Sequence, residues 1–216
     1  MNKDVVIIDY GSGNLRSAAK AFERCLADND LKGKVTVSSD HQELGSASHI
    51  VLPGVGAFAD CRRGLGNVPG MVEALTTHVI EGGKPFLGIC VGMQLMADVG
   101  LEHGSTEGLG WIAGEVEALK PSDKTLKIPH MGWNNLDFSP NSHVLLEDIE
   151  PGDHAYFVHS YQYHCKSPKD CFATVDYAEP ITALIAHDNM AGTQFHPEKS
   201  QQTGLTLIRN FLKWNL

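Results

Sequence analysis

Short apolar segments alternate with longer amphipathic segments along the first hundred residues, and this alternation limits the possible folds more than any other feature. The apolar segments are residues 5–8, 35–37, 50–52 and 85–89. The amphipathic segments are residues 15–26, 57–65, 71–80 and 91–99. Apolar runs of this length predict buried strands, and apolar positions three and four apart predict helices. Their order along the chain predicts a doubly wound α/β fold with a mostly parallel sheet.

The second half of the chain has a different pattern. Between residues 111 and 195 the segments are short and alternating, and turn residues separate them. Examples are residues 115–119, 156–158, 161–165 and 181–185. Alternation of this kind predicts antiparallel strands, which we expect to be appended to the sheet. Residues 203–214 have apolar positions at helical spacing and predict a closing helix.

Length and composition predict a single domain over residues 1–216. The chain is 42% hydrophobic and 20% charged, as in ordinary globular proteins. Its net charge of −9, with no cluster of Lys and Arg, argues against a nucleic-acid partner. No run approaches the ~20 apolar residues that span a bilayer, and no signal peptide is present, so we expect no membrane association. Five cysteines without a Cys-x-x-Cys pair favour a reducing cytoplasm over a disulfide framework.

Cys90 stands where a buried strand ends and a helix is predicted to begin. Glycines at 88 and 92 flank it on both sides. This spacing resembles a nucleophile elbow, in which small neighbours let the chain make a sharp turn that exposes the nucleophile at the edge of the sheet. Open α/β sheets bind ligands at that edge. The alternative is that Cys90 is a small buried hydrophobic residue, as most cysteines are.

A reactive cysteine needs a base, and His196 has the most informative context of the histidines. Pro197 disfavours helical geometry at His196, so we expect an extended chain in which His196 and Glu198 point to the same side. Glu198 could then orient the imidazole while its second nitrogen faces the thiol, as in a catalytic triad. The alternative is an exposed turn with a chance His-x-Glu sequence.

The segment from Leu52 to Gly56 follows a buried strand and is rich in Gly and Pro. Such a turn can direct main-chain N–H groups toward a developing oxyanion, and the N–H of Val91 is the natural second donor. The alternative is an ordinary connection between a strand and a helix.

Together these residues resemble the class I (triad) glutamine amidotransferases over nearly the whole chain. Within that class the resemblance is strongest to one branch, the glutaminase subunits of imidazole glycerol phosphate synthases, which supply ammonia for histidine biosynthesis. The segments that carry the resemblance are residues 8–15, 53–56, 88–94, 129–134 and 194–198. The last of these is shared by the whole class, whereas the first, second and fourth point to the branch.

The resemblance implies that the substrate is L-glutamine and that Cys90, His196 and Glu198 are the nucleophile, base and orienting carboxylate. It implies that Val55 and Val91 supply the oxyanion hole. It also implies a set of residues that bind glutamine through side chains or main-chain groups. These are Gly54, Gly56, Gln94, His159, Ser160 and Tyr161.

The resemblance further implies a heterodimer with a separate (β/α)₈-barrel cyclase subunit, which receives the ammonia. Met131 and Trp133 are then interface candidates, the alternative being that both are core residues of a strand. The family also suggests that the glutaminase stays nearly silent until the partner is bound and loaded. A flip of the peptide unit between Gly54 and Val55, which would swing the Val55 N–H into the oxyanion hole, would explain that behaviour.

Other signals carry less weight. The sequence Gly11-Ser12-Gly13 begins like a dinucleotide loop, but Arg16 stands where the third glycine belongs, so we predict no nucleotide cofactor. The histidines show no metal-ligand spacing, so we predict no metal. Two alternatives to the leading interpretation stay open. One is the glutaminase subunit of another synthase, such as pyridoxal phosphate synthase. The other is an inactive, amidotransferase-like binding subunit.

Overall fold

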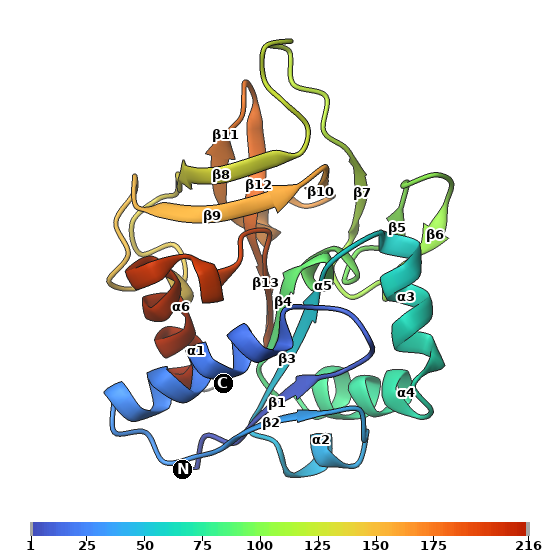
Figure 1. The fold of residues 1–216 in the computed structure, drawn as a ribbon, viewed down its shortest axis with the longest axis vertical. Coiled ribbons are helices and arrows are strands. Elements are labelled where there is room, and N and C mark those ends of the chain that lie inside the picture. The colour runs from blue at the N-terminus through green and yellow to red at the C-terminus, as the bar shows by residue number, and fades with distance from the viewer. Residues whose placement is uncertain (1, 215–216) are drawn as a thin grey trace.

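The computed structural model describes residues 2–214, which fold around a seven-stranded sheet (Figure 1). The strand order is β11-β12-β13-β4-β3-β1-β2. The strands are β1 Val5–Ile8, β2 Val35–Ser38, β3 His49–Gly54, β4 Phe86–Cys90, β11 Cys171–Asp176, β12 Pro180–His187 and β13 Met190–Thr193. The strands from β13 to β2 are parallel, and β11 and β12 extend the sheet in antiparallel pairs. This arrangement confirms the predicted doubly wound α/β fold with a mostly parallel sheet and appended antiparallel strands.

Helices cover both faces of the sheet. Figure 1 shows α1 and α6 on one side of the strands and α3 and α4 on the other. The helices are α1 Leu15–Asp28, α2 Glu43–Ser46, α3 Phe58–Asn67, α4 Met71–Leu75, α5 Val91–Gln94 and α6 Gln201–Lys213, with a π-helical turn, η1 Thr76–Glu81, continuing α4. The chain runs from β1 outward to β2 and then returns past β1 to β3. The carboxyl ends of β3 and β4 therefore lie beside the point where the strand order reverses, which is where open α/β sheets bind ligands.

The appended strands divide among three sheets rather than extending one. Of the strands in the second half, β11, β12 and β13 join the main sheet. A four-stranded sheet contains β5 Val99–Gly100, β6 Thr106–Glu107, β7 Gly114–Ala118 and β10 Tyr161–Cys165. A separate pair contains β8 His130–Asn135 and β9 His154–His159. The alternating pattern predicted β7, β9 and β10 but not β5, β6 or β8. It did not predict which strands pair, because pairing over such sequence separations is decided by the packed core.

The helix predicted over residues 91–99 is wrong at its carboxyl end. Helix α5 stops at Gln94, and Val99–Gly100 forms β5. The carbonyl groups of Leu95, Met96 and Ala97 accept hydrogen bonds from the backbone N–H groups of residues 109–112. Those long-range bonds replace the i to i−4 bonds that would have continued the helix. The predicted helices at 15–26, 57–65 and 203–214 are confirmed to within a few residues.

The central strands form the core that supports the site. All residues of β1, β3 and β4 are buried, as expected for parallel strands covered on both faces. Short helical turns complete the chain at η2 Val144–Leu146, η3 Pro168–Asp170 and η4 Pro197–Lys199. Within residues 2–214 no helix combines the length and the apolarity needed to cross a bilayer.

Candidate active site

Cys90 lies at the carboxyl end of β4, in a turn that leads directly into α5. Its backbone has φ 54° and ψ −112°, a conformation that few non-glycine residues adopt. The turn depends on the flanking glycines, since an added Cβ at Gly92 would lie 1.8 Å from the Leu52 carbonyl oxygen. A Cβ at Gly88 would lie 2.6 Å from the carbonyl oxygen of Gly92. The predicted elbow geometry is present, although the helix behind it has only four residues.

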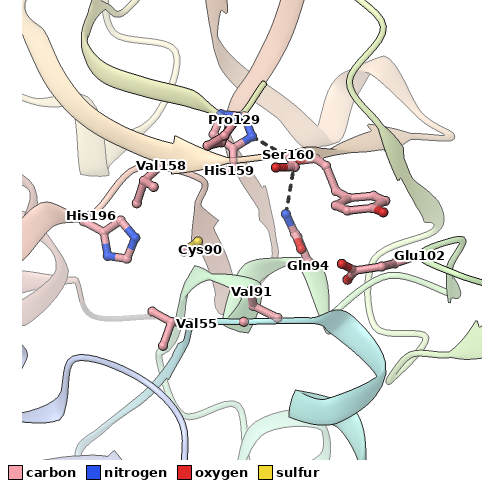
Figure 2. Close-up of a pocket in the computed structure, with 12 residues that line it drawn as sticks. Val55, Cys90, Val91, Gln94, Glu102, Pro129, Val158, His159, Ser160 and His196 are labelled. Carbon is pink, nitrogen blue, oxygen red and sulfur yellow. Dashed lines mark hydrogen bonds between the residues drawn. The ribbon is translucent and has the colours of Figure 1, made fainter. Parts of the chain in front are cut away.

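His196 and Glu198 meet as a buried pair. The Nδ1 atom of His196 donates to Oε1 of Glu198 over 2.9 Å, and the two side chains are 2% and 3% exposed. His196 itself is extended, as Pro197 predicts, whereas Glu198 lies in the 3₁₀ turn η4 rather than in an extended chain. Nε2 of His196 has no hydrogen-bond partner within residues 2–214. Figure 2 shows the imidazole turned toward the Cys90 sulfur.

The surroundings of His196 favour its charged form. Burial lowers the pKa of the imidazole, but the adjacent thiol of Cys90 and the hydrogen-bonded carboxylate of Glu198 outweigh that effect and raise the pKa to about 9. A protonated His196 beside Cys90 stabilises a thiolate, which is the nucleophilic form of cysteine. The arrangement therefore suits attack on an electrophilic carbon followed by proton donation to a leaving group.

A cavity of about 280 Å³ opens beside Cys90 and His196. Most predicted site residues line it, namely Val55, Gly56, Cys90, Val91, Gln94, His159, Ser160, Tyr161 and His196. Gly54 does not line the cavity. It is closely packed instead, and an added Cβ there would meet the Tyr10 hydroxyl and the backbone of Gly92. Glu198 lies behind His196 and borders a different cavity. The tertiary structure thus collects side chains from β4, α5, the β9–β10 turn and the segment before α6.

The Val55 N–H donates to Ser12 Oγ over 3.0 Å. The Ser12 hydroxyl in turn donates to the Val55 carbonyl over 2.6 Å, and the Cys61 thiol also contacts that carbonyl. In this conformation the Val55 N–H is engaged elsewhere and does not complete an oxyanion hole. Ser12 was not predicted as a site residue, because nothing in its local sequence relates it to residue 55.

Gln94 is held by two hydrogen bonds from its side-chain amide. Nε2 donates to the Tyr161 carbonyl over 3.2 Å and to Gln194 Oε1 over 2.9 Å. Gln194 Nε2 then donates to Cys90 Sγ over 3.6 Å. Gln194 belongs to the segment 194–198, but no local pattern predicts a role for its side chain. In the structure Gln194 links the Cys90 thiol to Gln94.

Glu102 also lines the cavity, although no sequence pattern predicted it as a site residue. One oxygen, Oε2, accepts the Phe58 N–H at the start of α3 over 2.6 Å. Figure 2 shows Cys90 between His196 and Gln94, with Glu102 farther along the cavity wall. The residue follows the short strand β5, where no local pattern marks it. Only the break in the predicted helix after Gln94 brings Glu102 to the site.

Met131 and Trp133 project from β8 with side chains that are 61% and 47% exposed. The interpretation that both are core residues is therefore wrong. Two large apolar side chains on the same exposed face of a strand suit a docking surface.

The residues that the structure describes contain no group of three or more His, Cys, Asp and Glu side chains arranged to hold a metal ion. The cysteines at positions 25, 61, 90, 165 and 171 are all free thiols.

Comparison with known proteins gives a consistent result. A family profile described as "Glutamine amidotransferase class-I" matches residues 6–214. The chain is 58% identical over 210 residues to a protein of Rhodospirillum rubrum named "Imidazole glycerol phosphate synthase subunit HisH", covering 97% of this chain and 98% of that protein. It is 57% identical to a protein of the same name from Brucella suis, again over 97% and 98% of the two chains.

Solved structures share the fold at lower identity. A structure described as a glutamine amidotransferase superposes with a TM-score of 0.70 at 17% identity, covering 96% of this chain and 97% of that one. A glutamine amidotransferase of Thermotoga maritima gives a TM-score of 0.63 at 15% identity over 94% and 79% of the two chains. At these identities the likeness concerns the fold alone.

Proposed function

The chain belongs to the class I glutamine amidotransferases, and from that premise we propose that it is the glutaminase subunit of an imidazole glycerol phosphate synthase. The proposal rests on relatives of that name at 57–58% identity over nearly the whole chain. The observation that carries the chemistry is the convergence of Cys90, His196 and Glu198 on one edge of the sheet, with the cavity beside Cys90 and His196.

In the first half of the proposed reaction, the Cys90 thiolate attacks the side-chain amide carbon of glutamine. The C–S bond forms, and the carbonyl electrons move to oxygen. When the tetrahedral intermediate collapses, the C–N bond breaks and His196 gives its proton to the departing ammonia. The raised pKa of His196, about 9, keeps that proton available at neutral pH. Glu198 holds Nδ1 of His196 and so keeps Nε2 facing the thiol.

In the second half, water attacks the glutamyl thioester with neutral His196 as the base, the C–S bond breaks, and glutamate leaves. Both halves pass through an oxyanion beside Cys90, where the N–H of Val91 is the proposed resident donor.

The ends of the cavity suit glutamine as the substrate. Gln94 lies beside Cys90, where the amide would react, and the Glu102 carboxylate suits the α-ammonium group at the other end. Gly56 and the His159-Ser160-Tyr161 segment supply the remaining wall.

The Val55 N–H is the proposed second oxyanion donor, but it reaches the cavity only after the Gly54–Val55 peptide rotates. Its hydrogen bond to Ser12 gives the resting enzyme a physical reason to be slow. We propose that binding of the partner shifts this peptide toward the conformation with a complete oxyanion hole. A ligand that favours one of two conformations changes their populations in this way.

The proposed partner is a (β/α)₈-barrel cyclase subunit that forms a heterodimer with this chain and receives its ammonia. Met131 and Trp133 form the proposed docking surface, since both are exposed on β8. A reducing, cytoplasmic setting is part of the proposal, because a thiolate at Cys90, which lines the cavity, is open to oxidation by small molecules.

The decisive experiment measures ammonia release from glutamine by the chain alone and in the presence of the cyclase with its nucleotide ligand. We expect the loaded partner to raise the rate of ammonia release strongly. Cys90→Ala should lower that activated rate about 10⁶-fold. Equal rates with and without the partner would contradict the proposed activation. Unchanged ammonia release by Cys90→Ala would instead favour an inactive binding subunit. Complementation of a histidine auxotroph separates this function from that of a pyridoxal phosphate synthase subunit.

A further inference from the structure

Two buried histidines join strand β8 to the cavity wall. His130 begins β8 and His159 ends β9, and the two stand directly opposite each other in the antiparallel pair. They are 3% and 6% exposed. Nδ1 of His130 lies 2.9 Å from Nε2 of His159. His159 lines the cavity, whereas His130 does not.

The hydrogen bonds around this pair can run in only one direction. A carbonyl oxygen can only accept, so the His159 Nδ1 that lies 2.8 Å from the Tyr161 carbonyl carries the hydrogen. Burial lowers the pKa of both histidines to about 4, so each is neutral at physiological pH and holds one ring hydrogen. Nε2 of His159 must then accept from Nδ1 of His130. The remaining nitrogen of His130 accepts from the Asn134 amide over 3.2 Å.

Both ends of this chain of hydrogen bonds are fixed. Asn134 uses its second amide hydrogen to donate to the Asp176 carbonyl over 2.8 Å. At the other end, the Tyr161 carbonyl accepts from both His159 and Gln94. Figure 2 shows dashed lines that leave His159 and Gln94 for these two bonds. The hydrogen bonds therefore continue without a break from β8 to Gln94. Through Gln194 they reach the sulfur of Cys90.

The orientation of the Gln94 amide follows from this arrangement. Both hydrogens of Nε2 are used, one by the Tyr161 carbonyl and one by Gln194. Within residues 2–214 no hydrogen bond engages the oxygen Oε1 of this side chain, which lines the cavity. A rotated amide would place an N–H group where the substrate now meets an acceptor. The Tyr161 carbonyl thus determines which atom of Gln94 a substrate encounters.

We propose that His130 and His159 are positioning residues for the substrate, which anchor the Tyr161 carbonyl from strand β8 and thereby fix the orientation of the Gln94 amide. The inference rests on the proposed glutaminase function. Neither histidine needs to gain or lose a proton in the reaction. His130 acts through His159, and His159 acts through the Tyr161 carbonyl.

The test compares His130→Phe, His159→Phe and the double variant in the full chain bound to its cyclase subunit. Loss of one well-placed hydrogen bond predicts a KM for glutamine about tenfold higher, with kcat changed less than threefold. Because the two histidines act in series, the double variant should be no worse than His159→Phe. His130→Asn keeps a donor near the Nδ1 position and should restore most of the lost affinity. Additive losses in the double variant, or an unchanged KM in both single variants, would overturn the proposal.

A second readout separates this inference from the proposed function. A diazoketone analogue of glutamine should label Cys90 about tenfold more slowly in His159→Phe at subsaturating concentration, whereas iodoacetamide, which has no amino-acid groups, should react at the wild-type rate. Equal slowing with both reagents would mean general damage to the site and would overturn the positioning role. If the analogue labels Cys90 at the same rate in the wild type and in the variants, the positioning role is wrong but the glutaminase function is not contradicted. Wild-type protein that the analogue does not label refutes the glutaminase function as well.

His49→Phe is the matched control. His49 is 2% exposed and lies at the opposite end of β3 from the cavity, where it packs against Phe211. It should leave the KM and both labelling rates unchanged. If the Phe variants do not fold, the KM for glutamine and the labelling rates are compared in His130→Asn and His159→Asn instead. The first keeps the donor toward His159, and the second keeps the donor toward Tyr161 while removing the acceptor for His130.

Discussion

At Cys90 the backbone takes a conformation that most side chains avoid, with φ 54°. Holding a non-glycine residue there costs about 1–3 kcal/mol, which the packing of β4 and α5 must offset. The same turn brings the sulfur beside His196 and Gln194. A strained residue in this position is informative, because a cysteine with only a packing role would have no reason to occupy it.

The raised pKa of His196 predicts how activity depends on pH. Below about pH 9 the imidazole holds the proton that the proposed mechanism passes to the leaving ammonia, and above that pH the proton is lost. We expect kcat of the activated glutaminase to fall above pH 9 with the loss of one proton. In Glu198→Gln the fall should begin at lower pH, because a neutral amide stabilises the imidazolium less. Rates measured across this range test the prediction, and a falling limb at the same pH in both proteins would contradict it.

The same variants test the ranking of the triad. Glu198→Gln should lose roughly 10⁴-fold in kcat, compared with about 10⁶-fold for Cys90→Ala, because an orienting group is worth less than the nucleophile. A Glu198→Gln enzyme as inactive as Cys90→Ala would contradict this order.

Ser12 predicts the basal rate of the free chain. Removing its hydroxyl in Ser12→Ala leaves the Val55 N–H without its present acceptor, which favours rotation of the peptide by about 1 kcal/mol. Ammonia release by the chain without a partner should therefore rise several-fold, and the activation by the partner should shrink. Ser46→Ala, at an exposed position in α2, is the control and should not change the rate. A lower basal rate in Ser12→Ala would show that Ser12 supports the active conformation instead.

At the scale of elements, the site depends on how closely α5 crosses β3. The backbone of Gly92 lies against the Leu52 carbonyl, so the two elements meet without side chains between them. This contact sets the position of the Val91 N–H relative to the end of β3. Any residue larger than glycine at position 92 forces the elements apart.

Gly92→Ala should accordingly lower the free energy of unfolding by about 1–3 kcal/mol and reduce glutaminase activity, because its Cβ would lie 1.8 Å from a backbone oxygen. Urea denaturation of the two proteins measures the difference. Gly66→Ala is the matched control. Gly66 lies in α3, where an added Cβ meets only the end of the Arg62 side chain at 3.4 Å, so stability there should be unchanged or slightly higher. Equal stability of Gly92→Ala and wild type would contradict the close crossing.

At the scale of the whole molecule, several histidines are buried in their neutral form. Burial lowers the pKa of His49, His130 and His159 to about 4, and it lowers that of His143 as well. In the unfolded chain a histidine titrates near 6.5, so unfolding takes up protons between these two values. The folded state therefore loses stability as the pH falls from 6.5 toward 4.

His49 offers the clearest test of this acid sensitivity, since burial and the charge of Lys3 both lower its pKa. The free energy of unfolding of wild type, measured by urea denaturation, should decrease steadily from pH 6.5 to 4.5. His49→Phe removes one of the groups that take up a proton, so its slope should be smaller by up to about 1.4 kcal/mol per pH unit. An identical slope in the two proteins would mean that His49 is not neutral in the folded state.

Much of the fold was predictable because its signals are local. Strand β1 coincides with the predicted range, and helices α1, α3 and α6 lie within a few residues of theirs. Apolar runs and helical spacing indicate directly which residues are buried, so they predict a strand or helix even when the elements it packs against are unknown. Helix α5 was predicted too long, because the hydrogen bonds that end it come from residues 109–112. The three-sheet arrangement of the second half depends on contacts of the same long-range kind.

The sequence by itself determined which groups are candidates for the reaction, since the glycines around Cys90 and the proline after His196 impose their conformations locally. Only the tertiary structure decided what surrounds those groups. Ser12, Glu102 and Gln194 reach the site through chain crossings that no local pattern encodes. His130 and Asn134 connect β8 to it in the same way. The physical reason is that hydrogen bonds between distant segments form only where the packed core brings the segments together.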